Sequence, residues 1–90
     1  MSAAGNIAAP GASAIVEVVA RALTDRPDEV RVIETEHKGA TLVELYVAAG
    51  DLGKVIGKQG RTAAALRTLA ASAAERSGKT VTVEIREGRP

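Results

Sequence analysis

The sequence contains no cysteine, phenylalanine or tryptophan, and only one histidine and one tyrosine among 90 residues. Without cysteine there is no disulfide scaffold, zinc ribbon, iron–sulfur site or cysteine nucleophile. A single histidine, His37, excludes a multi-histidine metal site and argues against a Ser-His-Asp enzyme. We therefore expect no catalytic residues, no metal and no cofactor. The lack of aromatic rings also argues against modules that stack nucleobases on aromatic side chains.

Long apolar runs are also absent. Residues 1–10 contain no Lys or Arg, and Glu17 and Arg21 interrupt the apolar stretch that follows. A secretory signal needs a basic start and an apolar core, and a membrane-spanning helix needs about 20 apolar residues. We therefore expect a cytoplasmic protein that has no contact with the membrane.

Acidic residues are missing from the middle of the chain. Residues 1–50 hold seven acids and four bases, whereas residues 52–74 hold no acid. The bases in that acid-free segment are Lys54, Lys58, Arg61 and Arg67. An anionic partner should therefore meet the second half of the chain. The net charge of +1 is small for a nucleic-acid-binding domain, so an ordinary solvated surface explains the charges equally well.

Length and periodicity predict one domain behind a short tail. Residues 1–12 are small, aperiodic and contain Gly and Pro, which is typical of a flexible tail, and residues 13–87 form the domain. We expect Ser13 to cap a first helix, which Pro27 ends. The apolar stripe of this helix is expected at Ile15, Val19, Ala22 and Leu23, widened by Val16.

Apolar residues then alternate with a period of two, which predicts strands. Residues 30–35 and 41–48 flank a turn at residues 38–40, so they are expected to form an antiparallel hairpin. A third alternating segment, residues 79–87, closes the chain. The expected buried positions of the last two strands are Val43, Leu45, Val47, Val81, Val83 and Ile85.

Helical spacing appears between the second and third strands. Asp51 is expected to cap a short helix with Leu52, Val55 and Ile56 on its apolar face. After an interruption at residues 57–60, a second helix is expected over residues 61–76. Its predicted stripe is Leu66, Leu69, Ala70 and Ala73. The order α-β-β-α-α-β predicts an α+β fold, a three-stranded mixed sheet with three helices on one face.

The tetrapeptide Gly57-Lys58-Gln59-Gly60 carries the functional signal. Glycines let a sugar-phosphate backbone approach the main chain, and the following helix presents free N–H groups and the positive end of its dipole. Lys58 and Arg61 add positive charge beside that point. The spacing does not fit a phosphate-binding P-loop. A plain helix–helix corner uses the same residues, so the tetrapeptide alone leaves both interpretations open.

The segment VIGKQGR, residues 55–61, resembles the signature of KH domains, and the element order resembles their type II arrangement. Residues 19–32, 48–71 and 77–85 resemble the small single-KH bacterial proteins of the KhpA family. The resemblance covers about residues 14–86. It implies a protein that binds single-stranded RNA, without catalysis, as a post-transcriptional regulator or RNA chaperone. It also implies a homodimer, or a heterodimer with a larger KH-containing RNA-binding protein.

The same resemblance implies which residues meet the RNA. The Gly-x-x-Gly loop would hold the RNA backbone. The implied contact residues are Lys54, Val55, Ile56, Gly57, Lys58, Gln59, Gly60 and Arg61, with Val55 and Ile56 as the groove floor. Thr62 and Ala63 stand where related sequences carry bulky aliphatic residues, which predicts weak base contacts. Lys79 is expected to reach the far edge of the groove.

Small side chains in the second long helix suggest a candidate dimer face, made by Ala64, Thr68 and Ala71. This suggests an alternative function. The chain would be a dimerisation or adaptor subunit for a larger KH-containing RNA-binding protein, with little RNA binding of its own.

Overall fold

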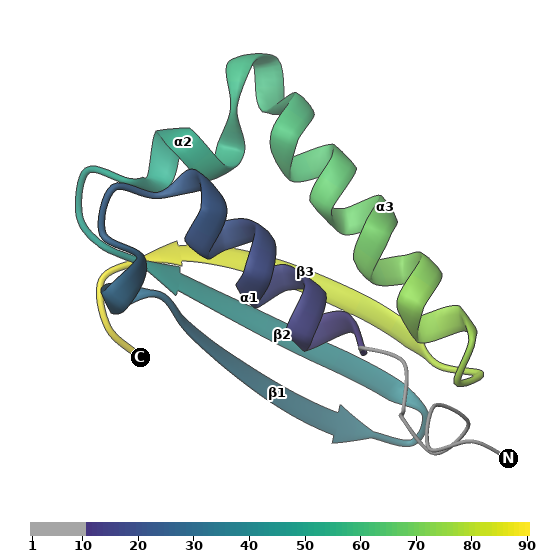
Figure 1. Ribbon diagram of the computed structural model, residues 1–90. Coiled ribbons are helices and arrows are strands. Elements are labelled where there is room, and N and C mark those ends of the chain that lie inside the picture. Colours follow the sequence, from purple (N-terminus) through teal and green to yellow (C-terminus); the bar gives the residue numbers. More distant parts are fainter. Residues whose placement is uncertain (1–10) are drawn as a thin grey trace, which may run out of the picture.

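Three α-helices cover one face of a three-stranded sheet in the computed structural model, which describes residues 11–90 (Figure 1). The helices and strands follow the predicted order, so the predicted α+β fold is confirmed. The α-helices are α1 (Ala12–Leu23), α2 (Leu52–Ile56) and α3 (Arg61–Glu75), and the strands are β1 (Arg31–His37), β2 (Ala40–Val47) and β3 (Thr80–Glu87). Two 3₁₀ turns, η2 (Pro27–Glu29) and η3 (Lys58–Gly60), precede β1 and α3.

The central strand is β2, which pairs antiparallel with β1 and parallel with β3. Lys38 and Gly39 join β1 to β2 with φ angles of 50° and 80°, and two positive φ angles match the twist of a tight hairpin. The parallel pair needs a long crossover, which α2 and α3 supply. Val43, Leu45 and Val47 of β2 have no exposed surface, as predicted. They form the floor of the core beneath the helices.

The buried side of α1 differs from the predicted stripe. Ala22 and Leu23 are exposed, and Ile15 is only half-buried. The residues that enter the core are Ala12, Val16 and Ala20, one every four positions. Successive helix residues are about 100° apart around the axis. The observed buried positions therefore lie on a different side of α1 from the centre of the predicted stripe.

The buried side of α3 also differs at one position. Leu66, Ala70 and Ala73 are buried as predicted, but Leu69 keeps 49% of its surface exposed. Ala63 and Ala74 complete the buried side. Leu69 lies about 100° around the helix from Ala70, and so it falls outside the part of α3 that faces the sheet.

The N-terminus of the domain was misplaced by one residue, and Ser13 is not a cap. Residues 1–10 of the predicted tail lie outside the described residues. Ala12 already belongs to α1 and is buried. No side chain caps α1, and the Ser13 hydroxyl instead donates a hydrogen bond to the Glu34 carboxylate on β1.

Asp51 does not cap α2 either. Its side chain is buried and accepts hydrogen bonds from the backbone N–H groups of Asp25 (3.2 Å) and Arg26 (3.1 Å). A carboxylate that accepts two backbone N–H bonds is strongly held. Asp51 therefore ties the loop after α1 to the start of α2.

Candidate nucleic-acid interface

The turn between α2 and α3 depends on glycine at two positions for different reasons. Gly57 has φ 77° and ψ 172°, a region that is almost exclusive to glycine. A Cβ atom there would lie 2.2 Å from Thr62 Oγ1 and 2.6 Å from Thr62 Cβ. Gly60 has φ 72° and ψ 12°, and nothing lies within 4 Å of a Cβ built on it. Gly57 is therefore required by the fold, whereas Gly60 leaves the surface of the turn open.

The start of α3 presents hydrogen-bond donors at this open surface. α3 has 15 residues, and no side chain caps its N-terminus. Two N–H groups are already used here, because the Gly60 N–H donates to the Gly57 carbonyl at 3.1 Å and the Arg61 N–H donates to the Lys58 carbonyl, so the free donors are those that follow Arg61. The first N–H groups of a helix lack partners within the helix and carry partial positive charge. With no side chain on Gly60 to cover them, an anion can approach these groups directly.

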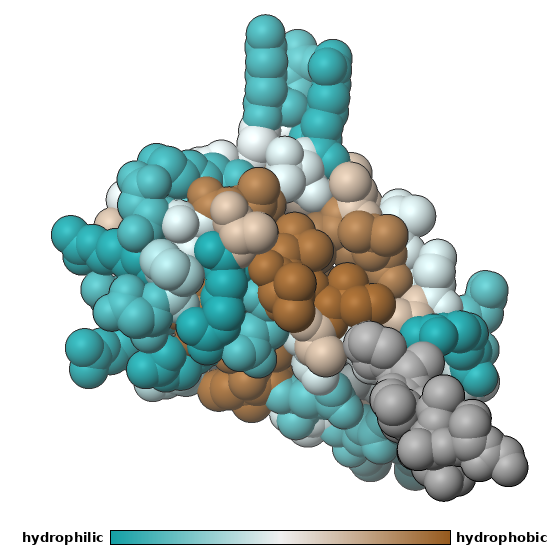
Figure 2. Space-filling view, in the orientation of Figure 1, coloured by the Kyte–Doolittle hydropathy of each residue, from teal (hydrophilic) through white to brown (hydrophobic). Residues whose placement is uncertain are grey.

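Cationic side chains surround the same turn. Lys58 is exposed and makes no ion pair within residues 11–90. Arg61 is exposed and donates to the Gln59 side-chain oxygen at 2.8 Å. Lys54 Nζ lies 3.2 Å from the Asp25 carboxylate, and both side chains are largely exposed. Figure 2 shows hydrophilic side chains projecting from the end of the molecule where this turn lies in Figure 1.

The predicted contact residues lie at one end of the domain, but they differ in accessibility. Lys54, Lys58, Gln59 and Arg61 are exposed, whereas Gly57, Gly60 and Ile56 are half-buried. Val55 has no exposed surface and belongs to the core. Val55 can support the groove floor from below but cannot touch a base, and Ile56 is the apolar residue of the pair that reaches the surface.

Thr62 and Ala63, which follow the turn, differ in accessibility. Ala63 is 2% exposed and packs inside, on the buried side of α3, so it cannot contact a ligand. Thr62 is half-buried and lies against Gly57. That Thr62 makes weak base contacts stays a prediction.

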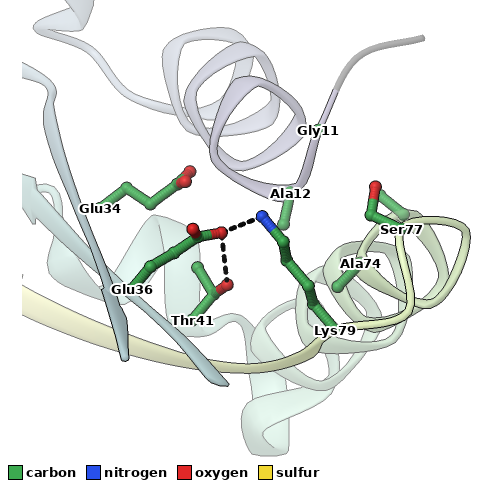
Figure 3. A pocket seen from close by; sticks show the side chains of 9 residues that line it. Gly11, Ala12, Glu34, Glu36, Thr41, Ala74, Ser77 and Lys79 are labelled. Carbon is green, nitrogen blue, oxygen red and sulfur yellow. Dashed lines mark hydrogen bonds and ion pairs between the residues drawn. The ribbon is translucent and has the colours of Figure 1, made fainter. Parts of the chain in front are cut away.

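Lys79 lies beyond the opposite end of α3 from the turn. α3 separates the two points by 15 residues, about 22 Å of helix. Lys79 forms an ion pair with Glu36, beside a small cavity of about 80 Å³ (Figure 3). The hydrogen bond from Lys79, together with its charge, lowers the pKa of Glu36, and the same hydrogen bond raises the pKa of Lys79. That Lys79 reaches the far edge of the groove stays a prediction.

Arg67 is not among the predicted contact residues, although it belongs to the acid-free segment. Its Nε donates to the backbone carbonyl of Val83 at 3.3 Å, so the side chain bridges α3 and β3. Only its position in residues 52–74 gave a signal in the sequence.

The candidate dimer residues are all on the surface. Ala64, Thr68 and Ala71 are exposed, and the Thr68 hydroxyl donates to the Ala64 carbonyl at 3.0 Å. A second exposed surface is more apolar: Val18 of α1 is 68% exposed and Leu69 of α3 is 49% exposed. Figure 2 shows apolar side chains gathered over these two helices.

Neither a metal centre nor a membrane span is found in the described part of the chain. Within residues 11–90, no three His, Cys, Asp or Glu side chains gather in a way that could hold a metal ion. No helix in that range is long and apolar enough to cross a bilayer.

The sequence is similar to known proteins over most of its length. Residues 13–85 match the family model described as KhpA/KhpB, KH domain. The RNA-binding protein KhpA of Clostridium acetobutylicum is 49% identical over 71 residues, which cover 79% of this chain and 95% of that protein. KhpA of Caldanaerobacter subterraneus is 51% identical with the same coverage. KhpA of Aquifex aeolicus is 49% identical over 73 residues, covering 81% and 92%.

Solved structures share the fold at lower sequence identity. Era in complex with MgGDPNP and nucleotides 1506–1542 of 16S ribosomal RNA superposes with a TM-score of 0.58 at 20% identity. Aquifex aeolicus Era bound to GDP and aluminium fluoride gives a TM-score of 0.60 at 20% identity. The similarity covers 84% and 87% of this chain but only 29% and 31% of those Era chains.

Proposed function

Because this chain belongs to the KhpA/KhpB KH-domain family, we propose that it binds single-stranded RNA through the turn Gly57–Gly60. The observation that carries this proposal is the open surface at Gly60, where nothing would meet a Cβ and the uncapped start of α3 follows. A plain corner between two helices accounts for the positive φ angles of both glycines, but it gives no reason for Lys58 and Arg61 to flank the uncapped start of α3 in a segment without acids.

The backbone of the RNA would lie against this turn. Phosphate oxygens accept hydrogen bonds from the N–H groups at the start of α3, and Lys58 and Arg61 supply charge on either side. The bases then extend over Ile56, an aliphatic surface that suits a domain with no Phe or Trp. Lys54 adds a third cation once its exposed pair with Asp25 is displaced.

This binding mode needs no catalytic group and no cofactor. We propose that the protein acts in the cytoplasm as a post-transcriptional regulator or RNA chaperone, and not as an enzyme. Backbone contacts tolerate many sequences, because phosphates carry no sequence information. A module that holds unpaired strands in this way stabilises single-stranded segments against pairing.

The proposal is tested by the double substitution Lys58→Asp with Gln59→Asp. Both side chains are exposed, so the thermal midpoint should change little, since exposed substitutions alter stability by about 0.5 kcal/mol or less. Two carboxylates would face the phosphates, so titration with fluorescein-labelled octauridine should show no binding. Lys38→Asp is the control, because it reverses a charge in another exposed turn, between β1 and β2.

Salt dependence gives a second measurement on the unmodified protein. If Lys54, Lys58 and Arg61 neutralise three phosphates, log affinity should fall against log salt with a slope of about −2, at roughly −0.7 per phosphate. A slope near zero, or full binding by the folded double variant, would remove the turn from the RNA site. Loss of binding by Lys38→Asp would show that general charge, not the turn, controls affinity.

We also propose that the chain self-associates or pairs with a larger KH-containing protein through α3. The observation that favours this is the apolar surface at Val18 and Leu69, since large exposed aliphatic side chains on adjacent elements are typical of contact surfaces. Ala64, Thr68 and Ala71 provide an alternative face on the same helix.

Single substitutions distinguish between these two candidate interfaces. Leu69→Arg should yield monomer in analytical ultracentrifugation if the apolar surface is the interface, and Ala64→Arg should do so if the small-residue face is used. Circular dichroism should stay unchanged in both variants, because both positions are exposed. A monomeric parent protein would refute homodimerisation, and a dimer that survives both substitutions would exclude α3.

A further inference from the structure

We propose that Arg67 selects the base of one nucleotide, favouring guanine or cytosine, in the RNA that the turn Gly57–Gly60 holds. This inference rests on the proposed function, because it concerns the same strand of RNA. It adds a residue that reads sequence to a site whose other polar contacts are with the backbone.

Arg67 is held between a helix and the edge of the sheet. The order β1-β2-β3 leaves β3 paired on one side only. From α3, the Arg67 Nε donates to the Val83 carbonyl of this edge strand at 3.3 Å. Within residues 11–90 no carboxylate pairs with Arg67, whereas Arg21, Arg26 and Arg86 each pair with a glutamate. Arg67 is therefore oriented but not neutralised.

The two terminal nitrogens of Arg67 remain available for a ligand. Nε is the only nitrogen of this side chain with a hydrogen-bond partner in the described residues. Its neighbours one turn before and after on α3 are Ala64 and Ala71, whose side chains are too short to cover a guanidinium. The planar guanidinium presents its N–H donors as a rigid fork. Because its Nε is already held, the guanidinium loses little conformational freedom when it binds a ligand.

The distance from the turn suits a neighbouring nucleotide. Arg67 follows Gly60 by seven residues along α3, about 10 Å of helix. A strand whose backbone is held at Gly60 can therefore place one of its next bases beside the guanidinium. The bases of single-stranded RNA are splayed out, so their Watson–Crick and Hoogsteen edges are free to be read.

The chemistry of the fork selects the base. A guanidinium donates two parallel hydrogen bonds and needs two adjacent acceptors. Guanine offers O6 and N7, and cytosine offers O2 and N3, whereas neither adenine nor uracil presents two adjacent acceptors on its Watson–Crick or Hoogsteen edge. A phosphate also offers two acceptor oxygens, so the experiment must separate base contact from backbone contact.

The experiment uses labelled octauridine in which a single guanine or cytosine is placed at each position in turn. With the unmodified protein, an oligonucleotide that places the guanine or cytosine beside Arg67 should bind about tenfold more tightly than octauridine itself. This is the scale of one bidentate base contact. Arg67→Lys keeps the charge but removes the fork, so octauridine affinity should be retained and the preference should fall to about twofold or less. Arg86→Ala, which removes an arginine from the open face of the sheet, should leave the preference intact.

Other outcomes overturn the inference. If Arg67→Ala weakens all oligonucleotides equally and lowers the salt slope by about 0.7, Arg67 contacts a phosphate and not a base. If the unmodified protein binds octauridine with no guanine or cytosine preference at any position, or if Arg67→Lys retains the preference, Arg67 does not read the base. In those cases the double variant of Lys58 and Gln59 still tests whether the turn binds RNA. If no oligonucleotide binds the unmodified protein, the proposed function itself is refuted.

Discussion

Replacing Gly57 by alanine should destabilise the domain far more than replacing Gly60, although both glycines have positive φ angles. At Gly57 the added Cβ would lie 2.2 Å from Thr62 Oγ1, 2.6 Å from Thr62 Cβ and 3.0 Å from the Thr62 backbone nitrogen. Rotation of the Thr62 hydroxyl relieves only the first contact. Cβ and the backbone nitrogen are fixed by α3, so the turn itself must move.

The magnitudes follow from the two conformations. The region occupied by Gly57 costs a non-glycine residue about 1–3 kcal/mol before any clash is counted, and the clash adds to this. Gly60 adopts the left-handed helical conformation, which costs alanine about 1–2 kcal/mol, and it has open space around it. Gly53→Ala is a matched control within α2, because Gly53 has no positive φ and no atom within 4 Å of its Cβ. That change should be neutral or stabilising by about 0.5–1 kcal/mol.

Thermal unfolding followed by circular dichroism measures the order of stability. About 1 kcal/mol shifts the midpoint of a domain of this size by roughly 4–8 °C. Gly60→Ala should therefore lose several degrees, Gly57→Ala at least twice as much, and Gly53→Ala none. Thr62→Gly, which removes both side-chain contacts, should recover part of the loss in Gly57→Ala. Equal midpoints for Gly57→Ala and Gly60→Ala would refute the distinction between a glycine packed against Thr62 and one that needs only its positive φ angle.

Three further predictions concern side chains around the site and at the far end of the domain. Asp25→Asn frees Lys54 from its ion pair at 3.2 Å. RNA affinity in a fluorescence titration should then rise by about two- to fivefold, which corresponds to the free energy of an exposed ion pair. An unchanged affinity would mean that Lys54 does not contact the RNA. Asp51→Ala leaves two backbone N–H groups without an acceptor and should cost about 2–4 kcal/mol in urea unfolding, whereas Asp51→Asn, which keeps one acceptor oxygen, should cost less. The pKa of Glu36 is lowered, so its pair with Lys79 stabilises the fold above pH 4.5 and is lost as the pH falls through the lowered pKa. The pKa of Lys79 is raised, so the pair stays intact at pH 10.5 and is lost only as the pH rises through the raised pKa. The difference in thermal midpoint between the unmodified protein and Glu36→Gln should therefore be present at neutral pH and disappear in acid, and a difference independent of pH would contradict this.

The positions of the strands and the order of the elements could be predicted from local pattern. Alternating residues in β2 can bury only one face, so Val43, Leu45 and Val47 identify the core side without any structure. The glycines around Lys58 and Gln59 likewise show the interruption between two helices, because a helix is broken by residues that favour positive φ.

Helix faces and caps could not be predicted as well, because they depend on distant residues. An apolar residue on a helix has the same local pattern whether it is buried, as Leu66 is, or exposed, as Leu69 is. Asp51 has the local context of a cap, but the chain brings the N–H groups of Asp25 and Arg26 to it from 26 and 25 residues away. Long-range hydrogen bonds of this kind leave no trace in spacing.

The sequence by itself determined the location of the candidate site, since the two glycines, the flanking bases and the missing acids are all local to residues 52–61. Tertiary structure alone decided which of those residues can be touched. It placed Val55 in the core and left Gly60 open, because burial depends on what packs against a residue and not on its neighbours in the chain. It also brought Arg67 to the edge of β3, 16 residues away, where a side chain that looks like one more surface charge gains a fixed orientation.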